Sequence, residues 1–319
     1  MHVRPMIEWP PAGQMSAAGG GGELDALDGE AIVQVAELLA DGGVVVLSGA
    51  GLSTESGIPD YRGATGSLRR HTPMTYQEFI ASEAGRQRYW ARSHLGWRTI
   101  TGAEPNEGHR AVAALGASGH VAGVITQNVD GLHRAAGTPD AVELHGSLDR
   151  VICLSCGVLS TREGLDHRLR AANAAFQAAS THINPEGDVE LDDSAVADFR
   201  VVPCEECADG MLKPDVVFFG ENVPKPRVQQ CYELIDRARG LLVLGSSLTV
   251  MSGLRFVRYA AKAGKPVAII NQGETRGDVH AAVRANLPLG TALTWLVGEL
   301  GVNPGVGAGG VVGVVGGAE

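Results

Sequence analysis

Four short runs of apolar residues lie along the middle of the chain, and each is bounded by glycine or polar residues. They cover residues 43–48, 120–126, 240–245 and 265–271. Short runs that are almost continuously apolar are typical of parallel strands buried on both faces. Between them, apolar residues recur at helical spacing over residues 30–39, 109–115 and 228–239. Alternating strands and helices predict a doubly wound α/β sheet.

Small and hydrogen-bonding residues follow each of the four predicted strands. The segments are residues 49–53, 127–130, 245–247 and 271–273. Ligands of open α/β sheets bind in the crevice outside the carboxyl ends of the strands. Four such ends together therefore predict a nucleotide-binding crevice. Ser246 and Ser247 suit a phosphate or a ribose there, and Asn271 suits a ribose hydroxyl.

The segment after the first strand has two of the three glycines of the dinucleotide-binding turn. Gly49 and Gly51 follow a strand and precede a predicted helix, where glycine lets backbone N–H groups approach a pyrophosphate. Thr54 stands where the third glycine is expected. Taken alone, this turn fits a tight strand–helix connection without a ligand equally well.

Four of the five cysteines form two C-x-x-C pairs, Cys153 with Cys156 and Cys204 with Cys207. Four thiolates at tetrahedral corners suit one structural zinc ion with no open position. The alternative is a pair of redox-active dithiols. Residues 157–203 separate the pairs, more than the ~15–20 residues usual in zinc ribbons. This insert has a helical pattern followed by an acidic run at 186–193.

Composition and charge exclude several classes of protein. Lys and Arg number 26 and Asp and Glu 36, so the formal net charge is −10, and no basic block suits a nucleic acid. No apolar run reaches the ~18 residues of a membrane span. Residues 1–22 lack the pattern of a signal peptide, and both they and the Gly-rich residues 301–319 are expected to be flexible. The expected location is the cytoplasm of a bacterium.

Longer motifs resemble those of the sirtuins and occur in the sirtuin order over about residues 25–298. They are GAGLSTESGIPDYR at 49–62, TQNVDGLH at 126–133, LHG at 144–146, KPDVVFFGE at 213–221 and GSSL at 245–248, together with the paired cysteines. Tyr61 stands where many sirtuins have phenylalanine. The sequences at residues 54–61 and 89–92, together with the long insert at 157–203, resemble those of class II sirtuins.

The resemblance implies an NAD-dependent protein-lysine deacylase that yields nicotinamide and O-acyl-ADP-ribose. His145 is then the catalytic base, with Asn128 and Asp130 as the other catalytic residues. The implied NAD contacts are Gly49, Ala50, Gly51, Ser53, Thr54, Asp60, Tyr61, Arg62, Gln127, Asn128, Val129, Asp130, Gly245, Ser246, Ser247, Asn271, Gln272, Gly273 and Leu289. The implied acyl-lysine contacts are Val217, Phe218, Phe219, Gly220 and Glu221.

The expected domains are a Rossmann-like NAD-binding domain in two stretches, 23–147 and 214–300, and a small zinc-binding domain at 148–213.

Sirtuins that remove succinyl groups carry a tyrosine and an arginine in a stretch comparable to residues 66–70, where this chain lacks the tyrosine. Desuccinylation is therefore not expected, and acetyl-lysine is expected to be accepted without being the best substrate. Two alternatives stay open: a protein mono-ADP-ribosyltransferase, and a non-enzymatic sensor of NAD or ADP-ribose.

Overall fold

The computed structural model describes residues 26–62, 72–178 and 184–303. Six parallel strands form its larger sheet, in the order β3-β2-β1-β7-β8-β9. Their bounds are β1 Val44–Ser48, β2 Val121–Thr126, β3 Val142–Glu143, β7 Gly240–Leu244, β8 Val267–Ile270 and β9 Val283–Ala285. From β1 the early strands extend to one side of the sheet, and from β7 the late strands extend to the other. This is the strand order of a Rossmann-like sheet. The predicted doubly wound fold is confirmed.

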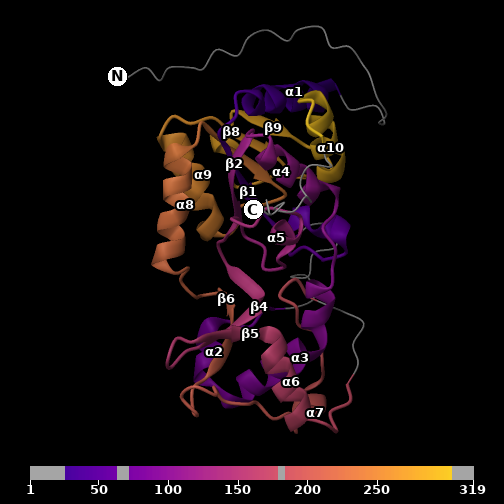
Figure 1. Cartoon of the computed structure of the whole chain (residues 1–319), viewed down its shortest axis with the longest axis vertical. Coiled ribbons are helices and arrows are strands. Elements are labelled where there is room, and N and C mark those ends of the chain that lie inside the picture. The colour runs from indigo at the N-terminus through magenta and orange to yellow at the C-terminus, as the bar shows by residue number, and fades with distance from the viewer. Residues whose placement is uncertain (1–25, 63–71, 179–183, 304–319) are drawn as a thin grey trace, which may run out of the picture.

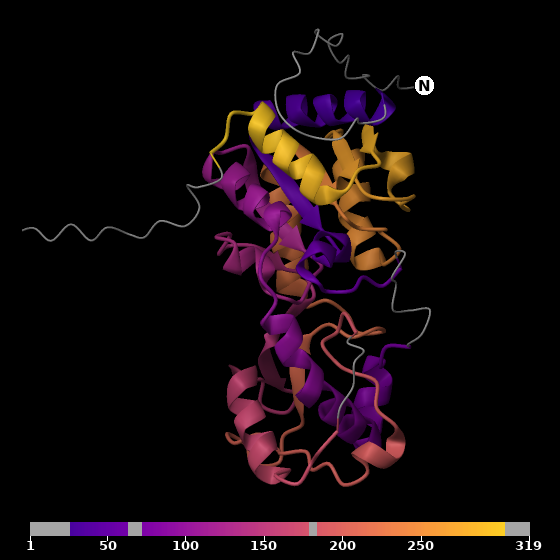
Figure 2. The same ribbon diagram turned by 90° about the vertical axis from the view of Figure 1, so that its right-hand side faces the viewer.

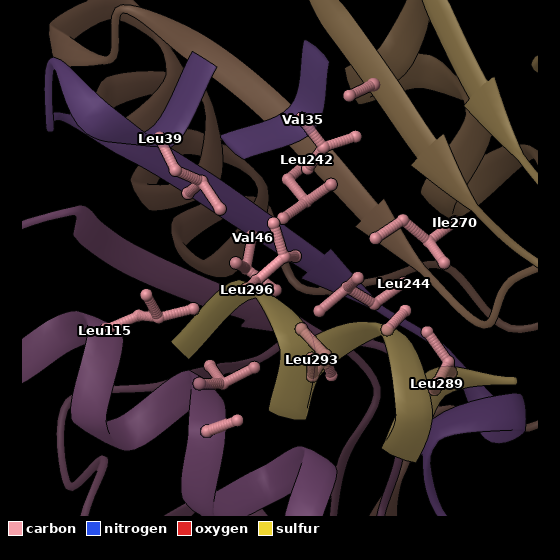
Figure 3. Packing of buried hydrophobic residues seen from close by; sticks show 14 of the residues in the cluster. Val35, Leu39, Val46, Leu115, Leu242, Leu244, Ile270, Leu289, Leu293 and Leu296 are labelled. Carbon is pink, nitrogen blue, oxygen red and sulfur yellow. The ribbon is translucent and has the colours of Figure 1, made fainter. Parts of the chain in front are cut away.

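Helices cover both faces of this sheet (Figure 1). One face carries α1 (Ala26–Ala40), α4 (Glu107–Ala117) and α10 (Leu289–Glu299), whose apolar side chains pack on β1, β7 and β8. Figure 3 shows this cluster, in which Leu293 and Leu296 of α10 face Val46 and Leu244. Full burial contributes about 1.5–3 kcal/mol for each Leu or Val. The other face carries α8 (Lys225–Arg237) and α9 (Met251–Lys262).

A second, antiparallel sheet of three strands lies at the other end of the molecule (Figures 1 and 2). Its order is β5-β4-β6, with β4 Gly146–Cys153, β5 Leu159–Thr161 and β6 Leu212–Val216. It packs with α2 (Tyr76–Ala81), α3 (Glu83–Thr101), α6 (Arg162–Ala172) and α7 (Asp193–Val196) in one hydrophobic cluster. The segment of α2 and α3, which precedes β2 in sequence, thus packs with the small sheet, whose strand β4 ends at Cys153.

One local prediction is wrong. No long helix follows the glycine turn after β1; two 3-10 turns stand there, η1 (Ala50–Leu52) and η2 (Thr54–Ser56). Gly57 ends the second turn in the left-handed region, with φ of +82°, and Pro59 follows two residues later. A left-handed residue and a proline both interrupt helical hydrogen bonding, so the helix cannot extend.

The remaining elements are short. They are α5 (Leu132–Ala135) and η4 (Asp278–His280). Within the described ranges, no helix is both long and apolar enough to cross a membrane. Residues 1–22, 66–70 and 304–319 lie outside the described residues, so the flexible ends stay predictions, as does the absence of desuccinylation inferred from residues 66–70. At the start of the predicted tail 301–319, the Gly301 and Val302 N–H groups donate to carbonyls of α10.

Candidate active site

A cavity of about 980 Å³ lies at the carboxyl ends of the parallel strands, and the segment after β6 forms part of its wall. Most sequence-predicted site residues line it: Gly49, Ala50, Gly51, Thr54, Asp60, Tyr61, Arg62, Gln127, Asn128, Val129, His145, Val217, Phe218, Phe219, Gly220, Glu221, Gly245, Ser246, Ser247, Asn271, Gln272, Gly273 and Leu289. Ser53 and Asp130 do not line it, but they are hydrogen-bonded to each other behind Asn128.

The two glycines after β1 allow a close approach between two strand ends. A Cβ atom on Gly49 would lie 2.7 Å from Cβ of Ser246, and one on Gly51 would lie 2.9 Å from Cα of Gly245. The Gly51 N–H donates to the Gly245 carbonyl at 2.9 Å. The backbone of the turn therefore reaches the cavity without side chains in the way, which suits a pyrophosphate as well as tight packing.

Ser53, Asn128 and Asp130 form a connected set of hydrogen bonds. The Ser53 hydroxyl donates to the Asp130 carboxylate at 2.7 Å and accepts from the Asn128 amide at 3.0 Å. Asn128 also donates to the Gly49 carbonyl at 3.1 Å. Burial raises the pKa of Asp130, while hydrogen bonds from Leu132 N–H and Ser53 lower it. The set fixes the orientation of Asn128 at the cavity wall.

His145 lies at the crossing from the large sheet to the small one, directly between β3 and β4. Its Nδ1 atom is 2.9 Å from the Gln127 carbonyl oxygen. Its Nε2 atom is 2.8 Å from Oγ of Ser252, in the first turn of α9. Burial lowers the pKa of His145 to about 4, so the imidazole is neutral near pH 7. A neutral imidazole can accept a proton.

The residue after His145 must be glycine for two independent reasons. Gly146 has φ of +84°, and a Cβ atom there would lie 1.8 Å from the Asp215 carbonyl oxygen of β6. We expect Gly146→Ala to lower the free energy of unfolding by about 2–4 kcal/mol, because left-handed strain and overpacking add. Urea unfolding measures this. Gly119→Ala is the matched control: its φ is +83° with nothing within 4 Å of the added Cβ, so it should cost only about 1–2 kcal/mol. Equal losses in the two variants would contradict the role of the Asp215 contact.

The segment after β6 is held rigidly beside His145. The Val217 N–H donates to the His145 carbonyl at 2.8 Å, and the Tyr76 N–H donates to the Phe219 carbonyl at 2.9 Å. The Glu221 carboxylate accepts from the Phe218 N–H at 2.8 Å and pairs with Lys213 at 3.1 Å. An extended segment fixed in this way offers backbone groups and aromatic rings to a ligand.

Tyr61 connects this segment to the opposite wall. Its ring lies edge-on to Phe219, with centroids 6.2 Å apart. Burial, reinforced by the nearby carboxylates of Glu186 and Asp188, raises the pKa of Tyr61 well above 10, so its hydroxyl stays protonated. In the same loop, Oδ1 of Asp60 is buried without a hydrogen-bond partner in the described part of the chain. An orphaned acceptor in the wall suits a ligand with hydroxyl or amide donors.

Several residues that the sequence motifs do not indicate also line the cavity, among them Tyr89, Glu186, Asp188, Ser252 and Arg255. Two of them, Glu186 and Asp188, belong to the acidic run at 186–193. Asp188 accepts from the Asn184 amide at 2.9 Å and pairs with Arg92 of α3 at 3.3 Å. Burial raises the pKa of Glu186 to about 8. For Ser252, the sequence carries no signal, since serine is common at helix starts.

The four cysteines form one cluster at the end of the small sheet. Their sulfur atoms all lie within 4.8 Å of one another, with 3.7 Å between Cys153 and Cys207 and 3.8 Å between Cys156 and Cys204. Zinc–sulfur bonds of about 2.3 Å at tetrahedral angles place sulfur atoms about 3.8 Å apart. The cluster therefore fits a structural zinc ion. Two separate redox dithiols would not need to meet.

The chain is similar to known proteins along most of its length. The Sir2 family profile matches residues 49–252. NAD-dependent protein deacetylase 1 of Streptomyces coelicolor is 61% identical over 96% of this chain and 98% of its own. NAD-dependent protein deacetylase 1 of Mycobacterium avium is 49% identical over 85% of this chain and 96% of its own.

Solved structures of Sir2 proteins have the same fold. A Sir2 complex with a deacetylated peptide and 3′-O-acetyl-ADP-ribose has a TM-score of 0.69 at 28% identity, covering 85% of this chain and 99% of that one. A Sir2 protein bound to an acetylated peptide has a TM-score of 0.67 at 27% identity, with the same coverage. The chain therefore belongs to the Sir2 family, the sirtuins.

Proposed function

We infer that the protein is an NAD-dependent protein-lysine deacylase, which moves the acyl group of a modified lysine onto ADP-ribose and releases nicotinamide. One observation carries this function: a neutral His145, held at both ring nitrogens, faces the same cavity as the strand-end residues and the aromatic segment after β6. The deacetylase names of relatives up to 61% identical support it.

The reaction divides into two steps with different requirements. In the first, the carbonyl oxygen of the acyl-lysine attacks the ribose carbon as nicotinamide leaves, and this step needs orientation rather than a base. In the second, His145 takes the proton of a ribose hydroxyl, whose oxygen then attacks the carbon of the acyl group. The C–N bond to lysine then breaks, the free amine leaves, and a water molecule supplies the remaining oxygen as the acyl group stays on ADP-ribose. A base that is neutral at working pH is suited to this step.

Residues at different strand ends are proposed to contact different parts of NAD. The backbone of residues 49–51 and the hydroxyls of Ser246 and Ser247 suit the phosphates, and Asn271 suits a ribose hydroxyl. Asn128 and Gln127 suit the nicotinamide ribose. Asp130, which the sequence assigns to the nicotinamide amide, does not line the cavity here and acts on its wall through Ser53. Asn128 is already oriented by Ser53 and Gly49, so little ordering would be needed when NAD binds.

The proposed acyl-lysine contacts are Val217 to Glu221, with the substrate backbone pairing as an added strand. Recognition by main-chain hydrogen bonds tolerates many substrate sequences. We further propose that zinc holds the small domain and takes no part in the chemistry, that the domain bounds are those given by the sequence, and that the location is the bacterial cytoplasm.

The test is incubation of the purified protein with NAD and peptides carrying acetyl, butyryl, lipoyl or succinyl lysine, with products identified by mass spectrometry. Free lysine together with O-acyl-ADP-ribose is the expected result. ADP-ribose attached to protein, with no acyl loss from any peptide, would instead support the mono-ADP-ribosyltransferase. NAD binding with neither product would support the non-enzymatic sensor.

Carboxylate-ended acyl groups are expected to be poor substrates, because Asp188 and Glu186 line the cavity. We expect kcat/KM for succinyl-lysine to be at least about tenfold below that for butyryl-lysine, as like charges repel. The gap should widen from pH 7 to pH 9, since the pKa of Glu186 is raised to about 8 and its carboxyl ionises over this range. Steady-state assays of both peptides at three pH values measure it. A ratio that is independent of pH would contradict a role for Glu186.

A further inference from the structure

The hydrogen bonds of His145 define its tautomer. The Gln127 carbonyl oxygen, 2.9 Å from Nδ1, can only accept, so Nδ1 carries the proton. Nε2 then has a free lone pair, and the Ser252 hydroxyl, 2.8 Å away, must be its donor. Ser252 thus occupies the lone pair that the base uses.

Ser252 is placed by the same helix start that packs against Gln127. It is the second residue of α9, and Gly253 follows it. A Cβ atom on Gly253 would lie 2.5 Å from Oε1 of Gln127, so the helix and the Gln127 side chain are in close contact. The Gln127 amide in turn donates to Oγ of Ser246 at 2.8 Å. The first turn of α9 therefore fixes both sides of the imidazole.

The hydroxyl of Ser252 has no competing role in the described ranges, where its bond to Nε2 is its only hydrogen bond. Two cations face the imidazole from neighbouring helices, Arg227 of α8 and Arg255 of α9, and both disfavour its protonated form. A hydrogen-bond donor to Nε2 also disfavours the protonated imidazole, because that hydrogen bond must break when Nε2 gains a proton.

We propose that Ser252 is a positioning residue for His145. Its hydroxyl holds the imidazole ring so that the Nε2 lone pair points to the place where the ribose hydroxyl later donates. This inference rests on the proposed function. In the base step, the ribose O–H bond breaks, the proton forms a bond to Nε2, and the electron pair stays on the ribose oxygen. The Ser252 hydroxyl turns about its Cβ–Oγ bond, and its oxygen is then free to accept.

The two steps of the reaction give a test that a merely structural role would not pass. Exchange of labelled nicotinamide into NAD requires only the first step, whereas loss of the acyl group requires the base. We expect Ser252→Ala to lower kcat for deacylation about tenfold and to leave exchange within about twofold of the unchanged protein. Ser252→Thr, which keeps the hydroxyl, should recover most of the deacylation. Ser160→Ala, at an exposed serine of β5, is the matched control.

The pH profile and the ¹⁵N NMR signals of His145 give a second readout. Removal of the donor should raise the pKa of His145 by about one unit, so the acid limb of kcat/KM moves to higher pH. Equal losses of exchange and deacylation, or an unchanged acid limb and unchanged kcat in Ser252→Ala, would overturn the inference. Absence of both activities in the unchanged protein would instead overturn the proposed function.

Discussion

Replacement of His145 by alanine is expected to lower deacylation by ~10²–10⁴-fold, the usual contribution of a general base. NAD should still bind, because the strand-end residues that suit the phosphates and the ribose do not depend on this side chain. Nicotinamide exchange should also persist, since the first step needs no base. The measurement is a rate of acyl loss beside a rate of exchange, with NAD affinity from calorimetry.

His167→Ala is the matched control, because that histidine is exposed on α6. It should change neither rate. The pH dependence gives an independent check: burial lowers the pKa of His145 to about 4, so the base is neutral from about pH 5 upward and activity should fall only as pH drops toward 4. Acyl loss at an undiminished rate in His145→Ala would show that another group takes the proton.

The elements that could be predicted from the sequence are those whose pattern is local. Strands β1, β7 and β8 are buried throughout and β2 at four of its six positions, and such burial leaves an almost unbroken apolar run. Strand β9 has only three residues, with Arg284 in the middle, and such a short segment has no distinct pattern. The 3-10 turns after β1 could not be predicted, because the apolar spacing alone allows a longer helix and the left-handed conformation of Gly57 ends it.

The parts of the site that could not be predicted depend on contacts between distant segments. Acidic residues in a loop normally face solvent, and only the packing of that loop on α3 brings Glu186 and Asp188 to the cavity. At Gly96 of α3, an added Cβ atom would lie 2.8 Å from the Gly187 carbonyl oxygen, so the loop rests directly on the helix backbone. The bond between Ser252 and His145 joins residues 107 positions apart, and nothing in either local sequence announces it.

The four-cysteine zinc site is expected to determine whether the hydrophobic cluster around the small sheet folds. Cys153 and Cys204 are both buried within the cluster of side chains that joins the small sheet to α2, α3 and α6. Loss of one ligand should abolish zinc binding, and the binding energy of a structural zinc, about 10–16 kcal/mol in small zinc domains, is folding energy. Cys153→Ala should therefore unfold this core at temperatures where the parallel sheet survives.

Zinc content by mass spectrometry, together with thermal unfolding followed by circular dichroism, measures this effect. The unchanged protein should hold one zinc ion, and Cys153→Ala should hold none and show an early transition. Cys231→Ala is the matched control, because Cys231 is buried in α8, away from the cluster, and should retain zinc while losing about 1 kcal/mol. A chelator should reproduce the early transition in the unchanged protein. The opposite result has three parts: Cys153→Ala stays folded, and the unchanged protein holds no zinc and forms disulfides reversibly. The cysteines would then act as redox dithiols, because that chemistry needs no metal to hold the core together.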